Sequence, residues 1–80
     1  LNKMIDTSVL ENENGYFIIL FNNSENPIKA KVVVNLDKKP EEKEIWDILE
    51  QKKGIIEKKK GKIILKTEIK GNGILLFPWF

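Results

Sequence analysis

The side chains that could do chemistry in this sequence are carboxylates and hydroxyls, because the chain contains no histidine, cysteine or arginine. Asp47 and Glu50 lie three residues apart, and a pair of carboxylates is what glycoside hydrolysis uses. Catalytic carboxylates need a cleft, however, and a domain of 80 residues has little room to form one. We therefore expect Asp47 to cap a turn, Glu50 to be solvated, and this chain alone to have no catalytic residues.

The hydroxyl groups lack the partner that would activate them. Ser8, Ser24, Thr7 and Thr67 have no histidine to act as a general base, and neither histidine nor cysteine is present to ligate a metal. Residues 71–73 place two glycines around one asparagine, which indicates a turn rather than a phosphate-binding loop. The sequence therefore predicts no cofactor and no metal site.

Composition narrows the class of protein. Eighty residues form one domain, and the net charge is only +2. Lysine is the only basic residue, which argues against a nucleic-acid partner, since arginine usually makes the bidentate contacts to phosphates and bases. No segment approaches the roughly 18 consecutive apolar residues of a membrane span. Because Leu1 is not an initiator methionine, we expect residues 1–80 to be one domain of a longer chain.

Short apolar segments separated by turn signals predict an all-β fold. We expect strands over residues 4–10, 16–21, 28–36, 62–69 and 74–77, joined by turns rich in asparagine and glycine. The segment 28–36 alternates between apolar and polar residues, which is typical of a half-buried strand. The pattern as a whole indicates a small antiparallel β-sandwich of about six to seven strands.

The segment 40–53 carries conflicting signals. Proline and two glutamates come first, apolar residues follow at helical spacing, and Gly54 lies just beyond two lysines, so local propensity favours a helix. The resemblance described below implies instead a short strand through Ile45 and Trp46, followed by a tight turn. We expect the strand and turn, with a short helix within 40–53 as the alternative.

The strand 16–21 is apolar on both faces, so a second apolar layer must cover it. If it neighbours the last strand, one of its faces lines the core and the other forms an apolar patch, which on a soluble protein marks an interface. Two interpretations stay open: another domain of the parent chain docks on the patch, or residues 37–53 fold over it. The expected docking residues are Phe17, Ile19, Phe21 and Val33.

Three segments together resemble a known sequence type. They are YFIILFNNSENPIKAKVVVNL (16–36), EIWDILEQ (44–51) and KIILKTEIKGNGILLF (62–77). With their asparagine turn, tryptophan–aspartate pair and glycine turn before a closing apolar strand, they resemble the C-terminal β-sandwich that follows the catalytic domain in large bacterial glycoside hydrolases. One departure is that a glycine often follows the aspartate closely in this type, whereas Gly54 comes later here.

The resemblance implies an accessory domain without catalytic residues, which packs on the catalytic domain of the same chain and stabilises it. Two alternatives belong to other classes of protein. A carbohydrate-binding module would stack sugar rings on exposed aromatic side chains, for which Trp46 and Trp79 are the candidates. A structural repeat unit of a surface protein would have further copies in the parent chain.

Overall fold

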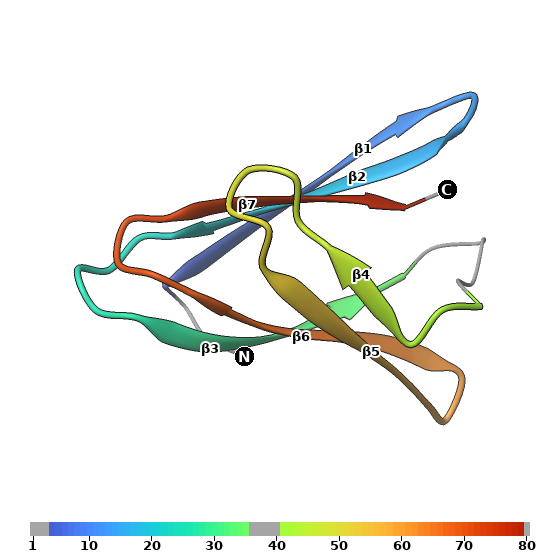
Figure 1. Cartoon of the computed structure of the whole chain (residues 1–80). Helices are drawn as coiled ribbons and strands as arrows, with labels where there is room; N and C mark the ends of the chain where they lie inside the picture. Colours follow the sequence, from blue (N-terminus) through green and yellow to red (C-terminus); the bar gives the residue numbers. More distant parts are fainter. Residues whose placement is uncertain (1–3, 36–40, 80) are drawn as a thin grey trace.

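The computed structural model describes residues 4–35 and 41–79, and these residues contain seven strands and no helix. The strands are β1 (Ile5–Asn12), β2 (Gly15–Asn22), β3 (Ile28–Val34), β4 (Glu44–Trp46), β5 (Lys53–Lys59), β6 (Lys62–Ile69) and β7 (Ile74–Trp79). They form one sheet in the order β1-β2-β7 and another in the order β3-β6-β5-β4, with antiparallel neighbours throughout (Figure 1). The predicted antiparallel β-sandwich is confirmed.

The core lies between the inner faces of the two sheets. Because side chains alternate along a strand, the core residues of a strand come from every second position. In β3 these are Ala30, Val32 and Val34, with Ile28 half-buried on the same side, as the alternating sequence predicts, while Leu36 lies outside the described residues. The largest fully buried apolar side chains are Trp79, Phe77, Ile18, Leu20, Leu65, Ile69 and Leu75.

Strand β2 pairs with β1 on one side and with β7 on the other, which confirms that the second and last apolar segments are neighbours. Its inward residues Ile18 and Leu20 are fully buried, whereas Phe17, Ile19 and Phe21 point to the opposite face and are half-buried. The continuous apolar sequence of β2 therefore reflects a strand with one face in the core and an apolar outer face.

The segment before β5 forms no helix. Glu44–Trp46 pairs with β5, and the chain then turns through residues 47–52, with Gln51 at a positive φ of 56°. Local propensity was a poor guide here because the strand pairing and the side chain of Asp47 satisfy the backbone instead. The expected strand through Ile45 and Trp46 is confirmed, and the helical alternative is wrong for residues 41–53.

The two tight β-hairpins in the described part of the chain, β1–β2 and β5–β6, each have a glycine in or next to the turn. Lys60 and Gly61 join β5 to β6 with φ values of 50° and 78°, which is the left-handed pair that a tight hairpin requires. Glycine reaches this conformation at no steric cost, which explains why Gly61 suits this turn. The β1–β2 turn consists of Glu13 and Asn14, with Gly15 already paired to Asn12.

Candidate functional site

Seven side chains make the outer face of β1–β2–β7 apolar. We call this surface the apolar face; its residues are Leu10, Phe17, Ile19, Phe21, Ile74, Leu76 and Pro78. The strand registers place Phe17 between Leu10 and Pro78, and Ile19 beside Leu76, so the central residues shield one another. The outer members are more open, with Leu10 57% exposed.

The loop between β4 and β5 extends the apolar face beyond β7. Figure 1 shows this loop, residues 47–52, arching beside β7 at the end where β4 finishes. The N–H of Ile48 donates to the carbonyl oxygen of Leu76 at 2.9 Å, which attaches the loop along the free edge of β7. Ile48 and Leu49 are both more than half exposed, so two further apolar side chains stand beside the face.

Acidic residues lie on β1, at the edge of the sheet away from the 47–52 loop. Within the three strands the charged residues are Asp6 and Glu11, both on the outermost strand β1, and Glu13 follows in the adjoining turn. All three are exposed. The four strands of the other sheet contain seven lysines and three glutamates, so the two sheets differ in the sign of their charge as well as in polarity.

Asp47 joins the two sheets through a buried carboxylate. Its side chain accepts hydrogen bonds from the N–H groups of Leu49, Glu50 and Lys52 within its own loop, and from the N–H of Leu76 in β7. The bond to Leu76 is 2.6 Å long, and Asp47 is 1% exposed. A carboxylate that accepts several N–H donors is held firmly, so Asp47 acts as a clasp between the 47–52 loop and β7.

Asn22 makes a second connection between the two sheets. Its Nδ2 donates to the carbonyl oxygens of Asn26, Ile69 and Lys70 at 2.8–3.1 Å, which ties the end of β2 to the end of β6. The residue is fully buried, and its Oδ1 has no partner within the described part of the chain. The local sequence around Asn22 predicts only an asparagine-rich turn and gives no sign of this connection between the sheets.

The sequence-predicted docking residues do not share one face. Phe17, Ile19 and Phe21 lie on the apolar face, but Val33 lies on β3, in the other sheet. Val33 is 42% exposed on the outer face of that sheet, where it pairs with Ile64. The expectation that all four residues share a face is therefore wrong, because β2 pairs with β1 and β7 rather than with β3.

The two tryptophans differ in environment. Trp79 is 2% exposed and packs in the core, so it presents no ring surface to a sugar. Trp46 is 56% exposed and pairs with Lys53 at the end of β4. In the described part of the chain, Trp46 is the one aromatic side chain that is more than half exposed.

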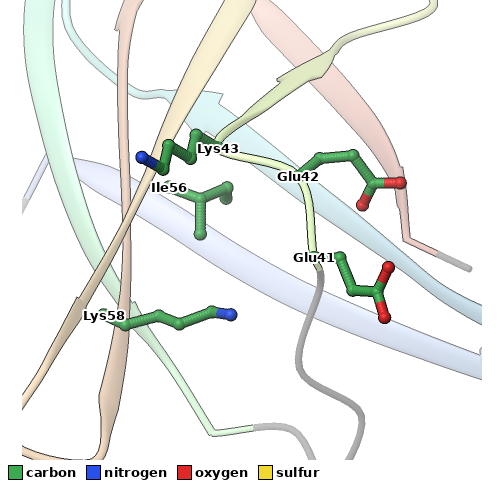
Figure 2. Close-up of a pocket in the computed structure, with 5 residues that line it drawn as sticks. All are labelled: Glu41, Glu42, Lys43, Ile56 and Lys58. Carbon is green, nitrogen blue, oxygen red and sulfur yellow. The ribbon is translucent and has the colours of Figure 1, made fainter.

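The hollow drawn in Figure 2 has a volume of about 270 Å³ and lies between β5 and the segment before β4. Ile56 and Lys58 line it from β5, while Glu41, Glu42 and Lys43 line it from the other side (Figure 2). The described lining residues are four charged side chains and one isoleucine, which give the hollow the character of a charged surface depression.

On the outer face of β3-β6-β5-β4, Lys66 donates to a carboxylate oxygen of Glu57 at 2.8 Å. The hydrogen bond from Lys66, helped by the charges of Lys66, Lys31 and Lys59, holds the pKa of Glu57 below its ordinary value. Lys31 lies directly opposite Lys66 in the β3–β6 register, so Glu57 offsets the repulsion between two neighbouring ammonium groups.

Residues 4–35 and 41–79 contain no cluster of three or more acidic, histidine or cysteine side chains placed to hold a metal ion. The same residues contain no helix long and apolar enough to cross a membrane. Comparison with family models, with curated proteins and with solved structures finds no match to this chain.

Proposed function

We propose that this chain is a non-catalytic accessory β-sandwich of a multidomain glycoside hydrolase. Through the apolar face it packs on the catalytic domain of the same polypeptide and stabilises that domain. The observation that carries the proposal is the apolar face itself, which places Phe17, Ile19 and Phe21 at the centre of an outer surface with acidic residues at one side only. The largest contiguous apolar patch on a protein surface is often functional, which supports a role for this face in binding.

The size of the apolar face favours a covalently linked partner. Three strands at about 4.8 Å spacing and six paired residues at about 3.3 Å each give a surface of about 300 Å². A free dimer of standard size buries about 800 Å² on each partner, whereas domains within one chain pack through smaller interfaces of about 600 Å² in total and above. A tethered neighbour meets this lower requirement because the linker supplies a high effective concentration.

The glycoside hydrolase part of the proposal is supported by the resemblance in sequence. Two of the motifs that carry the resemblance, the asparagine turn and the Trp46-Asp47 pair, contain the clasp residues Asn22 and Asp47. The resemblance therefore includes both residues that connect the two sheets. It carries no information about the sugar or the linkage that the parent enzyme would cleave.

The first test is the reading frame upstream of Leu1, where we expect a catalytic domain; its absence would sink the proposal. The second test uses the full-length parent protein with Phe17→Asp and Phe21→Asp together. We expect the half-life of the catalytic activity at elevated temperature to fall severalfold, because a charged face no longer packs on its neighbour.

Val33→Asp in the same full-length protein is the matched control. Val33 is an exposed apolar residue on a strand of the same fold, but it lies on the opposite outer face. We expect the half-life of this variant to equal that of the unmodified protein. Equal losses from both substitutions would mean that the apolar face has no special role in docking.

Carbohydrate binding is favoured by one observation, the exposed ring of Trp46. Titration with oligosaccharides, followed by tryptophan fluorescence, tests it directly. Because Trp79 is buried, a shift on addition of sugar would come from Trp46, and Trp46→Ala would abolish it. We expect no shift, since a sugar platform uses two or three coplanar rings and Trp46 stands alone among the described residues.

A further inference from the structure

The free edge of β1 offers backbone groups in a regular series. The N–H of Asn23 donates to the carbonyl oxygen of Met4 at 2.7 Å, so Met4 and Asn23 form a directly hydrogen-bonded pair. In an antiparallel ladder such pairs alternate with non-bonded ones, so the even-numbered residues of β1 bond to β2. The N–H and C=O groups of the odd-numbered residues therefore point away from β2, on the side where residues 4–35 and 41–79 add no further strand to the sheet; they are Ile5, Thr7, Val9 and Glu11.

At the other edge of this sheet, the residues of β7 alternate in the same way between bonding to β2 and pointing outward. The N–H of Asn22 donates to the carbonyl oxygen of Gly73, so β7 bonds to β2 through its odd-numbered residues and turns its even-numbered ones outward. There, both backbone groups of Leu76 are occupied by the 47–52 loop. Pro78 has no N–H to leave unpaired. The edge of β7 is thus closed to a further strand.

The other sheet also protects its edges. Strand β3 carries Lys29 and Lys31, and lysines on an edge strand discourage pairing with another chain. Strand β4 has only three residues. Strand β1, by contrast, has eight residues without lysine, proline or glycine, and seven of them are exposed. Figure 1 shows it as the outermost strand of its sheet.

We propose that β1 is a strand-addition site for an extended peptide segment that carries lysine or arginine opposite Asp6 and Glu11. The segment hydrogen-bonds to the outward backbone groups of Ile5, Thr7, Val9 and Glu11, as in recognition by sheet extension. Its basic side chains pair with the exposed carboxylates of β1, which gives the site a preference for charge as well as for backbone geometry. This edge site uses the backbone of β1, which adjoins the apolar face and contributes Leu10 to it.

A second copy of the chain fits the edge poorly. Pairing β1 with another β1 would place Asp6, Glu11 and Glu13 of both copies on one ribbon, and like charges on neighbouring strands are destabilising. The acidic side chains therefore argue for a basic partner segment rather than for self-association.

The probe is the synthetic peptide acetyl-TKVTVTKV-amide, whose two lysines face Glu11 and Asp6 when it lies antiparallel to β1. Amide hydrogen exchange of the 80-residue chain is measured by NMR with and without the peptide. At a peptide concentration ten times the dissociation constant, exchange at Thr7 and Val9 slows about tenfold. The matched acidic peptide acetyl-TEVTVTEV-amide leaves these amides unchanged.

Two sets of variants make the result decisive. Thr7→Pro removes one outward N–H without removing a bond to β2, so the chain keeps its β2 and β7 amide protection but loses affinity for the basic peptide at least tenfold. Ser8→Pro, one residue on, removes a bond of the β1–β2 ladder and loses protection in β1 even without peptide. Asp6→Lys with Glu11→Lys reverses the preference, so that the acidic peptide binds better.

Three outcomes would overturn the proposal. The first is the absence of any change at Thr7 and Val9 at 1 mM basic peptide. The second is equal binding of the basic and acidic peptides, and the third is unchanged binding to Thr7→Pro. Perturbations that fall on Phe17 and Phe21 but not on β1 would count as the first outcome and would assign the peptide to the apolar face instead.

Discussion

The outer faces of the two sheets differ along every cross-strand row. On β1–β2–β7 the rows are Leu10–Phe17–Pro78, Ser8–Ile19–Leu76 and Asp6–Phe21–Ile74. On the other sheet the comparable rows are Lys29–Glu68, Lys31–Lys66–Ile55 and Val33–Ile64–Glu57. Each row of the second face contains a charge, whereas a single charged residue, at the outermost strand, interrupts the first.

This difference decides which face suits a protein partner. Covering the second face would remove lysines and glutamates from water, and desolvating charges costs more than their attraction returns unless each finds a partner. Covering the first face removes apolar surface from water and displaces no charge from its centre, which is favourable at about 25 cal/mol per Å². The sandwich therefore has one face suited to solvent and one suited to an interface.

The largest effect should separate the two sides of β2. Leu20 is fully buried, and its neighbour Phe21 lies on the apolar face. Leu20→Asp places a carboxylate in the core and should lower the free energy of unfolding by more than about 4 kcal/mol, enough to unfold a domain of this size. Phe21→Asp should lower it by about 1 kcal/mol, since the charge stays at the surface.

Urea denaturation followed by circular dichroism measures both variants of β2. Comparable losses from Leu20→Asp and Phe21→Asp would mean that Phe21 belongs to the isolated domain's own core. In that case the apolar face would need no partner, and the contrast between the two outer faces would lose its functional meaning.

The next effect should come from the clasp that joins the two sheets. Asp47→Ala leaves four backbone N–H donors without their acceptor, and hydrogen bonds to a charged group are worth about 1.5–3 kcal/mol each before relaxation. We expect the free energy of unfolding to fall by about 3 kcal/mol and the midpoint of thermal unfolding to fall by about 15 °C.

Glu50→Ala is the control for the clasp. Glu50 lies in the same loop and pairs with Lys70 at 2.7 Å, but both side chains are partly exposed. Surface pairs of this kind contribute about 0–1 kcal/mol, so the thermal midpoint should move by only a few degrees. Equal shifts for the two variants would show that Asp47 does no more than an ordinary loop residue.

Residue patterns alone predict most of the strands but not how the strands pair. The alternation in β3 and the glycine at the β5–β6 turn each follow from local chemistry, so they could be predicted. The helix signals of residues 41–53 were misleading because Asp47 binds the backbone of its own loop and of β7, a competition that propensity does not include.

The arrangement of the candidate site needed information that no single strand contains. Alternation tells which residues of β2 and β3 point the same way within each strand, but not which strands share a sheet. Val33 was therefore grouped with Phe17 although it lies on the opposite outer face. The protected and unprotected edges likewise depend on pairing parity, which becomes visible only when the registers are known.

A moderate effect should come from the inner faces, where the two sheets meet. A Cβ atom added at Gly54 of β5 would lie 2.6 Å from a methyl carbon of Leu65 and 2.9 Å from the ring of Phe77. Gly54→Ala should therefore lower the free energy of unfolding by about 1–3 kcal/mol through overpacking. Differential scanning calorimetry measures this change.

Phe77→Leu tests whether the cause at Gly54 is steric. The smaller side chain makes room for the added methyl group, so the double variant should lose less than the sum of the two single losses. Additive losses would mean that the sheets do not meet closely at Gly54 and that the shared core is looser there.

The smallest effect concerns the charged outer face. Because the folded state holds the pKa of Glu57 below its ordinary value of 4.5, the carboxylate contributes stability above that pH. The contribution is lost as the pH falls from about 4.5 through the lowered pKa of the folded state. Carboxyl ¹³C NMR should show Glu57 titrating at lower pH than an unpaired glutamate, and high salt should reduce the difference.

Lys66→Met should return the pKa of Glu57 toward its ordinary value, because the hydrogen bond from Lys66 is the largest cause of the shift. Lys70→Met removes a lysine that pairs with Glu50 instead, so it should leave the titration of Glu57 unchanged. A Glu57 pKa that does not respond to Lys66→Met would mean that its partner in solution is water. Hydration alone would then stabilise the charges on the second outer face. A clear response would instead show that these charges form pairs across neighbouring strands.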